Sequence, residues 1–188
     1  MMNIPPMAST LTLLAALLVG AVLTDLRSRR IPNKLVLSGL TSALVLHAFA
    51  LFAGQPSLAG AAWWSPLAGA ATGFALMLPL HLLRAMGAGD VKLMAMVGAF
   101  IGPAAVAHAT LYTLLAGGLL SLVFMLGRGV AAQTLVNIRF MLTDLALRRA
   151  SGHSLRLAPL QTTAARLPYA LAIALGTGAA LAWPLRGF

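Results

Sequence analysis

Five long apolar stretches, separated by short segments that hold most of the charges, constrain this chain more than any other feature. A helix needs about 20 mostly apolar residues to cross the hydrocarbon core of a bilayer. Only 9% of the residues are charged, whereas soluble domains carry roughly 25%. The chain therefore cannot cover itself with a polar surface, and we predict an all-α, polytopic membrane protein. The apolar stretches cover residues 6–24, 35–52, 65–83, 92–127 and 167–183.

The stretch 92–127 is too long for a single crossing of the membrane. Arg84 and Arg128 flank it, and basic flanks collect on the cytoplasmic side of a membrane. We therefore expect an even number of crossings with a break at 101–103, or a re-entrant segment as the alternative. The expected total is about six transmembrane helices in a single integral-membrane domain over 1–188.

The distribution of charge orients these helices in the membrane. No basic residue precedes the first stretch, whereas several follow it, so we expect a retained helix whose N-terminus lies outside. Cytoplasmic loops are then expected at about 25–34, 84–92 and 128–166, with both chain termini outside. Within the last loop, residues 130–150 alternate apolar and charged side chains at helical spacing, which predicts an interfacial helix lying on the membrane.

The balance of charges and the missing residue types exclude several classes of protein. A net charge of +10 can indicate nucleic acid, but basic cytoplasmic loops explain it in a membrane protein, so we expect lipid headgroups as partners and no nucleic acid. Cysteine and glutamate are both absent, which excludes disulfides, thiol nucleophiles, Cys-ligated zinc and the HExxH metalloprotease helix. We expect neither a metal site nor a cofactor.

Two of the three acidic residues stand at the ends of apolar stretches. Asp25 follows the first stretch and Asp90 precedes the fourth, so the topology brings both to one membrane face. Two converging carboxyl groups are the minimum for aspartyl proteolysis, in which one activates water and the other, protonated, polarises the scissile carbonyl. Two close carboxylates do not both ionise cheaply, so they share a proton. Asp144, four residues before Arg148, is expected to form an ordinary surface pair.

Other interpretations of Asp25 and Asp90 stay open at this point. Both can be interfacial residues that pair with the neighbouring basic side chains Arg27, Arg29, Arg84 or Lys92. They can also be the ion or proton sites of a small transporter or channel subunit, although transporters place such groups near the bilayer midplane. If they form a catalytic pair, the helix dipole predicts that Asp90, near a helix start, is the base. Asp25, near a helix end, would then hold the proton.

The segments around the two aspartates resemble the motifs of the type IV prepilin peptidases, which are membrane aspartyl proteases of the Gly-x-Gly-Asp kind. The first motif is an aspartate followed by a basic stretch and Ile31-Pro32-Asn33. The second motif is Gly87-Ala88-Gly89-Asp90-Val91-Lys92-Leu93. Pro168-Tyr169 also resembles the start of the final helix in this family.

The resemblance implies a membrane endopeptidase that removes the basic leader from prepilins at the cytoplasmic face of the bacterial inner membrane. Asp25 and Asp90 match the two catalytic aspartates, and the remaining motif residues are expected along the approach of the substrate. The lack of cysteine pairs resembles the short branch that serves Flp/Tad-type pili without a methyltransferase domain. The expected partner is a prepilin. The residues matched beside the aspartates are Gly87, Gly89, Lys92, Ile31, Pro32 and Asn33.

Overall fold

The computed structural model describes residues 6–83, 86–127, 139, 143 and 169–183, and these residues contain no strand. The helices are α1 (Pro6–Ser28), α2 (Asn33–Phe52), α3 (Ser65–Leu82), α4 (Ala88–Gly127) and α6 (Tyr169–Ala182). In this described part, α1 to α4 are long and apolar enough to cross a membrane, and α6 is a shorter apolar helix. The all-α polytopic membrane fold is confirmed, whereas the total of about six crossings stays a prediction.

The chain forms two compact units, residues 1–117 with 168–188 and residues 118–167. The first unit holds α1, α2, α3, α6 and most of α4. Asp144 and nearly all of the interfacial helix expected at 130–150 lie outside the described residues. The two described positions in that range, Arg139 and Thr143, are helical, and the Thr143 hydroxyl donates to the Arg139 carbonyl at 3.0 Å.

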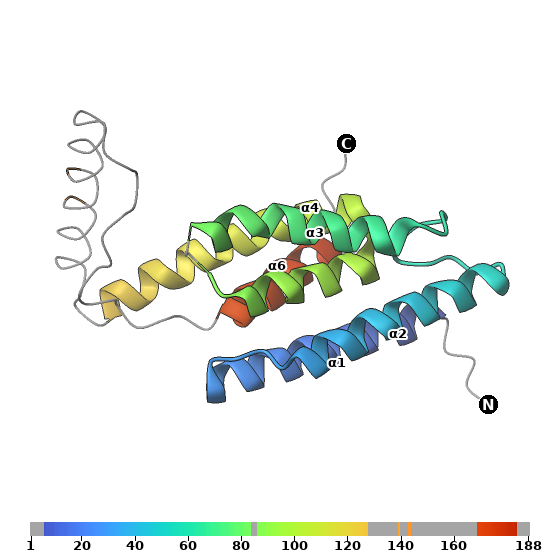
Figure 1. Cartoon of the computed structure of the whole chain (residues 1–188), viewed down its shortest axis with the longest axis horizontal. Helices are drawn as coiled ribbons and strands as arrows, with labels where there is room; N and C mark the ends of the chain where they lie inside the picture. The colour runs from blue at the N-terminus through green and yellow to red at the C-terminus, as the bar shows by residue number, and fades with distance from the viewer. Residues whose placement is uncertain (1–5, 84–85, 128–138, 140–142, 144–168, 184–188) are drawn as a thin grey trace. The chain divides into compact units, whose positions relative to one another are not determined.

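A break at Gly102 divides α4, at one of the places that the sequence suggested. Gly102 has φ 80° and ψ 174°, a conformation that residues with a Cβ rarely adopt, and Pro103 cannot continue the helical hydrogen bonds. A Cβ at Gly102 would also collide with the carbonyl of Ala59. The chain turns back here, so the residues before and after the break run in opposite directions (Figure 1). At about 1.5 Å per residue, the segment 88–101 is roughly 21 Å long and shorter than the ~30 Å bilayer core.

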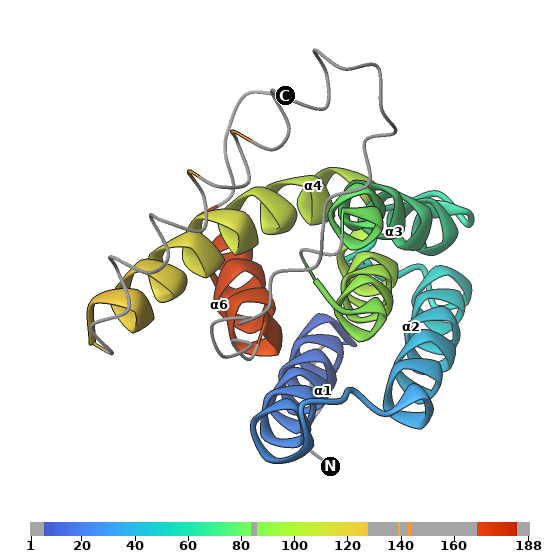
Figure 2. The ribbon, with the colours of Figure 1, turned by 60° about the vertical axis from the view of Figure 1, so that its left-hand side comes forward.

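The segment 88–101 is the central helix of the first unit. Figure 2 shows α1, α2, α3 and α6 standing around it. From Val91 to Gly102 every residue is buried except Lys92. The sequence of this segment is apolar on all sides, and such a helix is typically buried by other helices.

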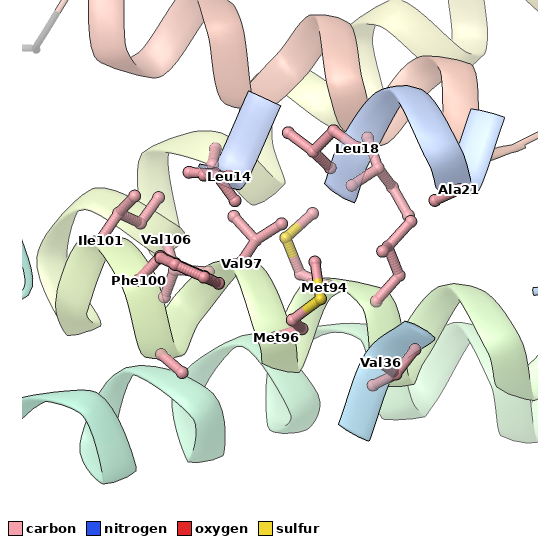
Figure 3. Packing of buried hydrophobic residues seen from close by; sticks show 14 of the residues in the cluster. Leu14, Leu18, Ala21, Val36, Met94, Met96, Val97, Phe100, Ile101 and Val106 are labelled. Atoms are coloured by element: carbon pink, nitrogen blue, oxygen red, sulfur yellow. The ribbon is translucent and has the colours of Figure 1, made fainter. Parts of the chain in front are cut away.

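Apolar side chains from neighbouring helices fill the space around this central segment. Leu14 and Leu18 of α1, Val36 of α2, and Met94 and Val97 of α4 belong to one buried cluster (Figure 3). Lipid tails are as apolar as these side chains, so close van der Waals packing has to hold the helices together.

Glycines allow the backbones of α3 and α4 to touch. A Cβ added at Gly69 would collide with the carbonyl of Gly98, and a Cβ added at Gly98 would collide with the carbonyl of Gly69. Gly73, one turn further along α3, lies against the carbonyl of Met94. The small residues at positions 69 and 73 therefore serve close packing within one molecule.

His47 ties the loop between α2 and α3 to α2. Its Nδ1 lies 2.7 Å from the Ser57 hydroxyl and its Nε2 lies 3.0 Å from the Ala62 carbonyl oxygen. A carbonyl oxygen only accepts, so Nε2 carries a proton and donates to Ala62. His47 is a buried structural residue. Trp63 and Trp64 in the same loop are exposed, as interfacial anchors require.

We expect Gly98→Ala to lower the free energy of unfolding by roughly 1–3 kcal/mol, because the added methyl group pushes the α3 and α4 backbones apart. Gly118→Ala is the matched control in the part of α4 beyond the break, since no described residue lies within 4 Å of a Cβ at that position. Thermal unfolding in detergent, followed by circular dichroism, compares the two variants. Equal unfolding temperatures would show that α3 and α4 do not meet at Gly98.

Candidate active site

Asp25 lies in the last turn of α1, which continues to Ser28 beyond the apolar stretch that ended at residue 24. Its side chain is buried, with 8% of the residue exposed. One carboxylate oxygen accepts a 3.2 Å hydrogen bond from the backbone N–H of Ala170. Ala170 is the second residue of α6, so its N–H has no partner inside its own helix. A helix start distant in the sequence therefore holds the Asp25 carboxylate.

Asp90 is the third residue of α4, and its side chain reaches back to the residue that precedes the helix. The N–H of Gly87 donates to Asp90 Oδ2 at 3.1 Å, and the N–H of Asp90 donates to the Gly87 carbonyl at 3.2 Å. The bond from Gly87 is the one that the third helical residue makes in a capping box. A Cβ at Gly87 would lie 3.3 Å from Asp90 Oδ2, so a glycine leaves this hydrogen bond undisturbed.

The two carboxyl groups are both buried and lie near each other in the first unit. They lie within the range over which their charges interact, and Asp90 is only 9% exposed. Tyr169, the first residue of α6, also lies within electrostatic range of Asp90, and its hydroxyl stands over Gly117. The end of α1 and the starts of α4 and α6 therefore converge on one place.

The loop between α1 and α2 packs on the start of α4. A Cβ added at Gly89 would lie 3.3 Å from Ile31 Cβ, so the Ile31 side chain rests on Gly89. Asn33 Oδ1 accepts a 3.2 Å hydrogen bond from Lys92 Nζ. Pro32 is the N-cap residue of α2. Ile31 and Asn33 thus each contact a residue of the second motif, which runs from Gly87 to Leu93.

Of the eight residues that the sequence placed at the site, the structure brings Asp25 and Asp90 within range of each other's charge. It also places Ile31 against Gly89 and Asn33 against Lys92. Gly87 binds Asp90 through its N–H, and Pro32 is the N-cap residue of α2. Among the described residues, neither aspartate forms an ion pair with Arg27, Arg29 or Lys92. Arg84 lies outside these residues, so only part of the ion-pair interpretation is tested. The part of the chain that the structure describes gathers no group of three or more His, Asp or Glu side chains that could hold a metal ion.

Ala170 was not among the expected site residues. Its contribution is a backbone N–H, which no side-chain pattern reveals, and the available signal was Pro168, since proline is common at helix starts. The start of α6 favours negative charge on Asp25, just as the start of α4 favours it on Asp90. The expectation that Asp90 is the base and Asp25 the proton holder rested on the end of α1 and the start of α4. The start of α6 opposes the effect of the α1 end on Asp25, and the assignment stays a prediction.

Comparison with known protein families agrees with the motifs. The model of the type IV leader peptidase family matches residues 12–122, which is more than half of the chain and includes both aspartates and the loop between α1 and α2. Neither the curated proteins nor the solved structures contain a match. The chain therefore belongs to the type IV leader peptidase family, and its general activity is that of a membrane peptidase, a hydrolase of peptide bonds.

Proposed function

We propose that the chain is a prepilin leader peptidase, an aspartic endopeptidase with Asp25 and Asp90 as its catalytic pair. One observation carries this proposal above the others. Two buried carboxyl groups from distant parts of the sequence lie within range of each other's charge, and a backbone N–H from a helix start binds each of them. Membership of the leader peptidase family supports the reaction class.

The proposed reaction needs one ionised and one protonated carboxyl group. The ionised carboxylate takes a proton from water while the water oxygen attacks the scissile carbonyl carbon, and the protonated carboxyl gives its proton to the carbonyl oxygen. The tetrahedral intermediate then returns a hydroxyl proton to the second carboxyl, the C–N bond breaks, and the first carboxyl protonates the leaving amine. Both groups end in their starting states. The N–H groups of Gly87 and Ala170 keep the carboxyls in place throughout, since fixed backbone donors need no reorganisation.

The charges around the pair support a site at the cytoplasmic face of the bacterial inner membrane. Arg27, Arg29, Arg30, Lys34 and Lys92 are all exposed near it, and basic residues flanking membrane helices collect on the cytoplasmic side.

The shortness of the first loop supports a particular branch of the family. Only residues 29–32 separate α1 from α2, and the whole chain has no cysteine. These features favour the short branch that acts on Flp/Tad-type prepilins, with a cleaved pilin whose new N-terminus is not methylated by this chain.

We expect Asp25→Asn and Asp90→Asn each to lower cleavage by roughly a thousandfold or more, because residues that act as one catalytic unit fail together. Asp144→Asn, the matched change at the third acidic residue, should leave cleavage unchanged. Each variant is co-expressed with a candidate prepilin from the same genome. A gel shift reports cleavage, and mass spectrometry of the pilin N-terminus reports the cut bond and the absence of a methyl group.

Two results would contradict the proposed function. The first is a wild-type protein that cuts no prepilin. The second is normal cleavage by both aspartate variants at normal protein levels. In either case proton or ion flux through a small transporter becomes the next activity to measure.

The contact between the two motifs generates a second prediction. We expect Gly89→Val to lower cleavage by roughly ten- to a hundredfold, because its side chain displaces Ile31 and shifts the start of α4, and small displacements at a catalytic centre are costly. Adding Ile31→Ala to Gly89→Val removes the displaced atoms and should restore part of the activity. Thermal unfolding of each variant checks that the fold persists. A double variant no more active than Gly89→Val would refute the contact as the reason for glycine at position 89.

A further inference from the structure

Two apolar grooves run along the first unit. One, of about 500 Å³, lies between α1 and α6, and we call it the α1–α6 groove. The other, of about 430 Å³, is lined by residues of α2, α3 and α4, and we call it the α2–α4 groove. A peptidase that cuts at Asp25 and Asp90 must hold the rest of its substrate on one side of this pair.

We infer that the α1–α6 groove is the docking surface for an apolar, membrane-embedded helical segment of the peptide substrate. The segment lies lengthwise in the groove and presents its end nearest the cut to Asp25. This inference rests on the proposed function and adds to it the part of the enzyme that selects the substrate.

The α1–α6 groove begins beside the catalytic pair. Val22 and Leu23 line it just before Asp25 on α1, and Leu171 lines it directly after Ala170 on α6. Asp25 and Ala170 are themselves joined by a 3.2 Å hydrogen bond. One end of the groove therefore lies within about one helical turn of the site on both α1 and α6.

The length of the α1–α6 groove suits a helical segment. Its lining extends along α1 as far as Leu11. At about 1.5 Å per residue, α1 rises roughly 21 Å between Leu11 and Asp25, which matches about four turns of a second helix laid beside it.

The lining of the α1–α6 groove suits an apolar occupant. No charged side chain lines it, and its residues are aliphatic apart from Gly178 and Thr177. Val19 and Leu181, on opposite walls, are 58% and 36% exposed, so they are open to an occupant. An extended polar peptide would bury its backbone groups without partners against such walls, whereas a helix satisfies them internally.

The two grooves differ in the charge of the residues that line them. Lys34 and Lys92 line the α2–α4 groove together with Leu37 and Phe74. Two ammonium groups attract an anionic lipid headgroup and repel a basic leader. The lining of the α1–α6 groove carries no positive charge and reaches Leu23, two residues before Asp25, so a substrate with a basic end and an apolar helix fits there.

Site-specific photocrosslinking tests this assignment. p-Benzoylphenylalanine replaces Val19 or Leu181 in the α1–α6 groove and Leu37 or Phe74 in the α2–α4 groove, all in the Asp90→Asn protein with full-length prepilin. We expect prepilin adducts from the first two positions, several-fold above those from the other two. Mass spectrometry should place the adducts in the apolar segment that follows the cut. Adducts only from Leu37 and Phe74 would overturn the inference.

Kinetics of the active enzyme give an independent readout. We expect Val19→Trp to fill the groove and raise KM for the full precursor by about tenfold with little change in kcat, as loss of uniform binding does. Val45→Trp on α2, where Val45 is 62% exposed and lines neither groove, is the matched control and should change neither constant. An unchanged KM in Val19→Trp would overturn the inference about the groove. The proposed function would still stand in that case, because the enzyme would still cut the precursor. A wild-type enzyme that cuts no precursor would refute both.

Discussion

The burial of α4 residues 88–101 is the constraint on which the described structure depends. Water is absent from the bilayer core, so close packing and not exclusion of water has to hold this helix among its neighbours. The backbone contact between Gly69 and Gly98 meets that need on one side, and the apolar cluster around Met94 meets it on the other. The break at Gly102 ends this helix at one end, and Asp90 near its N-terminus is buried inside the unit.

Helix starts solve two problems at the site together. Buried carboxylates are costly unless hydrogen bonds or counter-charges stabilise them. The first N–H groups of a helix lack partners within the helix. Gly87 and Ala170 supply such N–H groups to Asp90 and Asp25, and no described lysine or arginine forms an ion pair with either. A pair held by backbone donors keeps both carboxyls available for the proton exchange that the proposed reaction needs.

Sequence reasoning identified the apolar helices, the two aspartates and both motifs, because each has a local signal. It placed helix ends less well, since α1 runs to Ser28 and α2 begins at Asn33. Hydropathy detects only the apolar part of a helix. The helical hydrogen bonds continue into the polar residues beyond it, so the helix ends later than the apolar stretch. It did not find Ala170, because a backbone N–H acting on Asp25 across the fold depends on how helices pack and on no residue type. The close packing of Gly69 and Gly73 against α4 is likewise a property of the folded chain, because it depends on which helices become neighbours.

The claim that the loop between α1 and α2 packs on the start of α4, and so brings the aspartates together, has a direct test. The chain has no cysteine, and a Cβ at Gly89 would lie 3.3 Å from Ile31 Cβ, close to the ~3.5–4.5 Å of a disulfide. Mild oxidation of the Ile31→Cys/Gly89→Cys protein should therefore form an intramolecular disulfide in most molecules, detected by mass spectrometry of its fragments. Ile31→Cys/Gly54→Cys is the control and should form none, because the 20 residues of α2 separate the two positions by about 30 Å. If Ile31→Cys/Gly89→Cys keeps both thiols free under conditions that oxidise exposed cysteines, the loop between α1 and α2 does not pack on the start of α4.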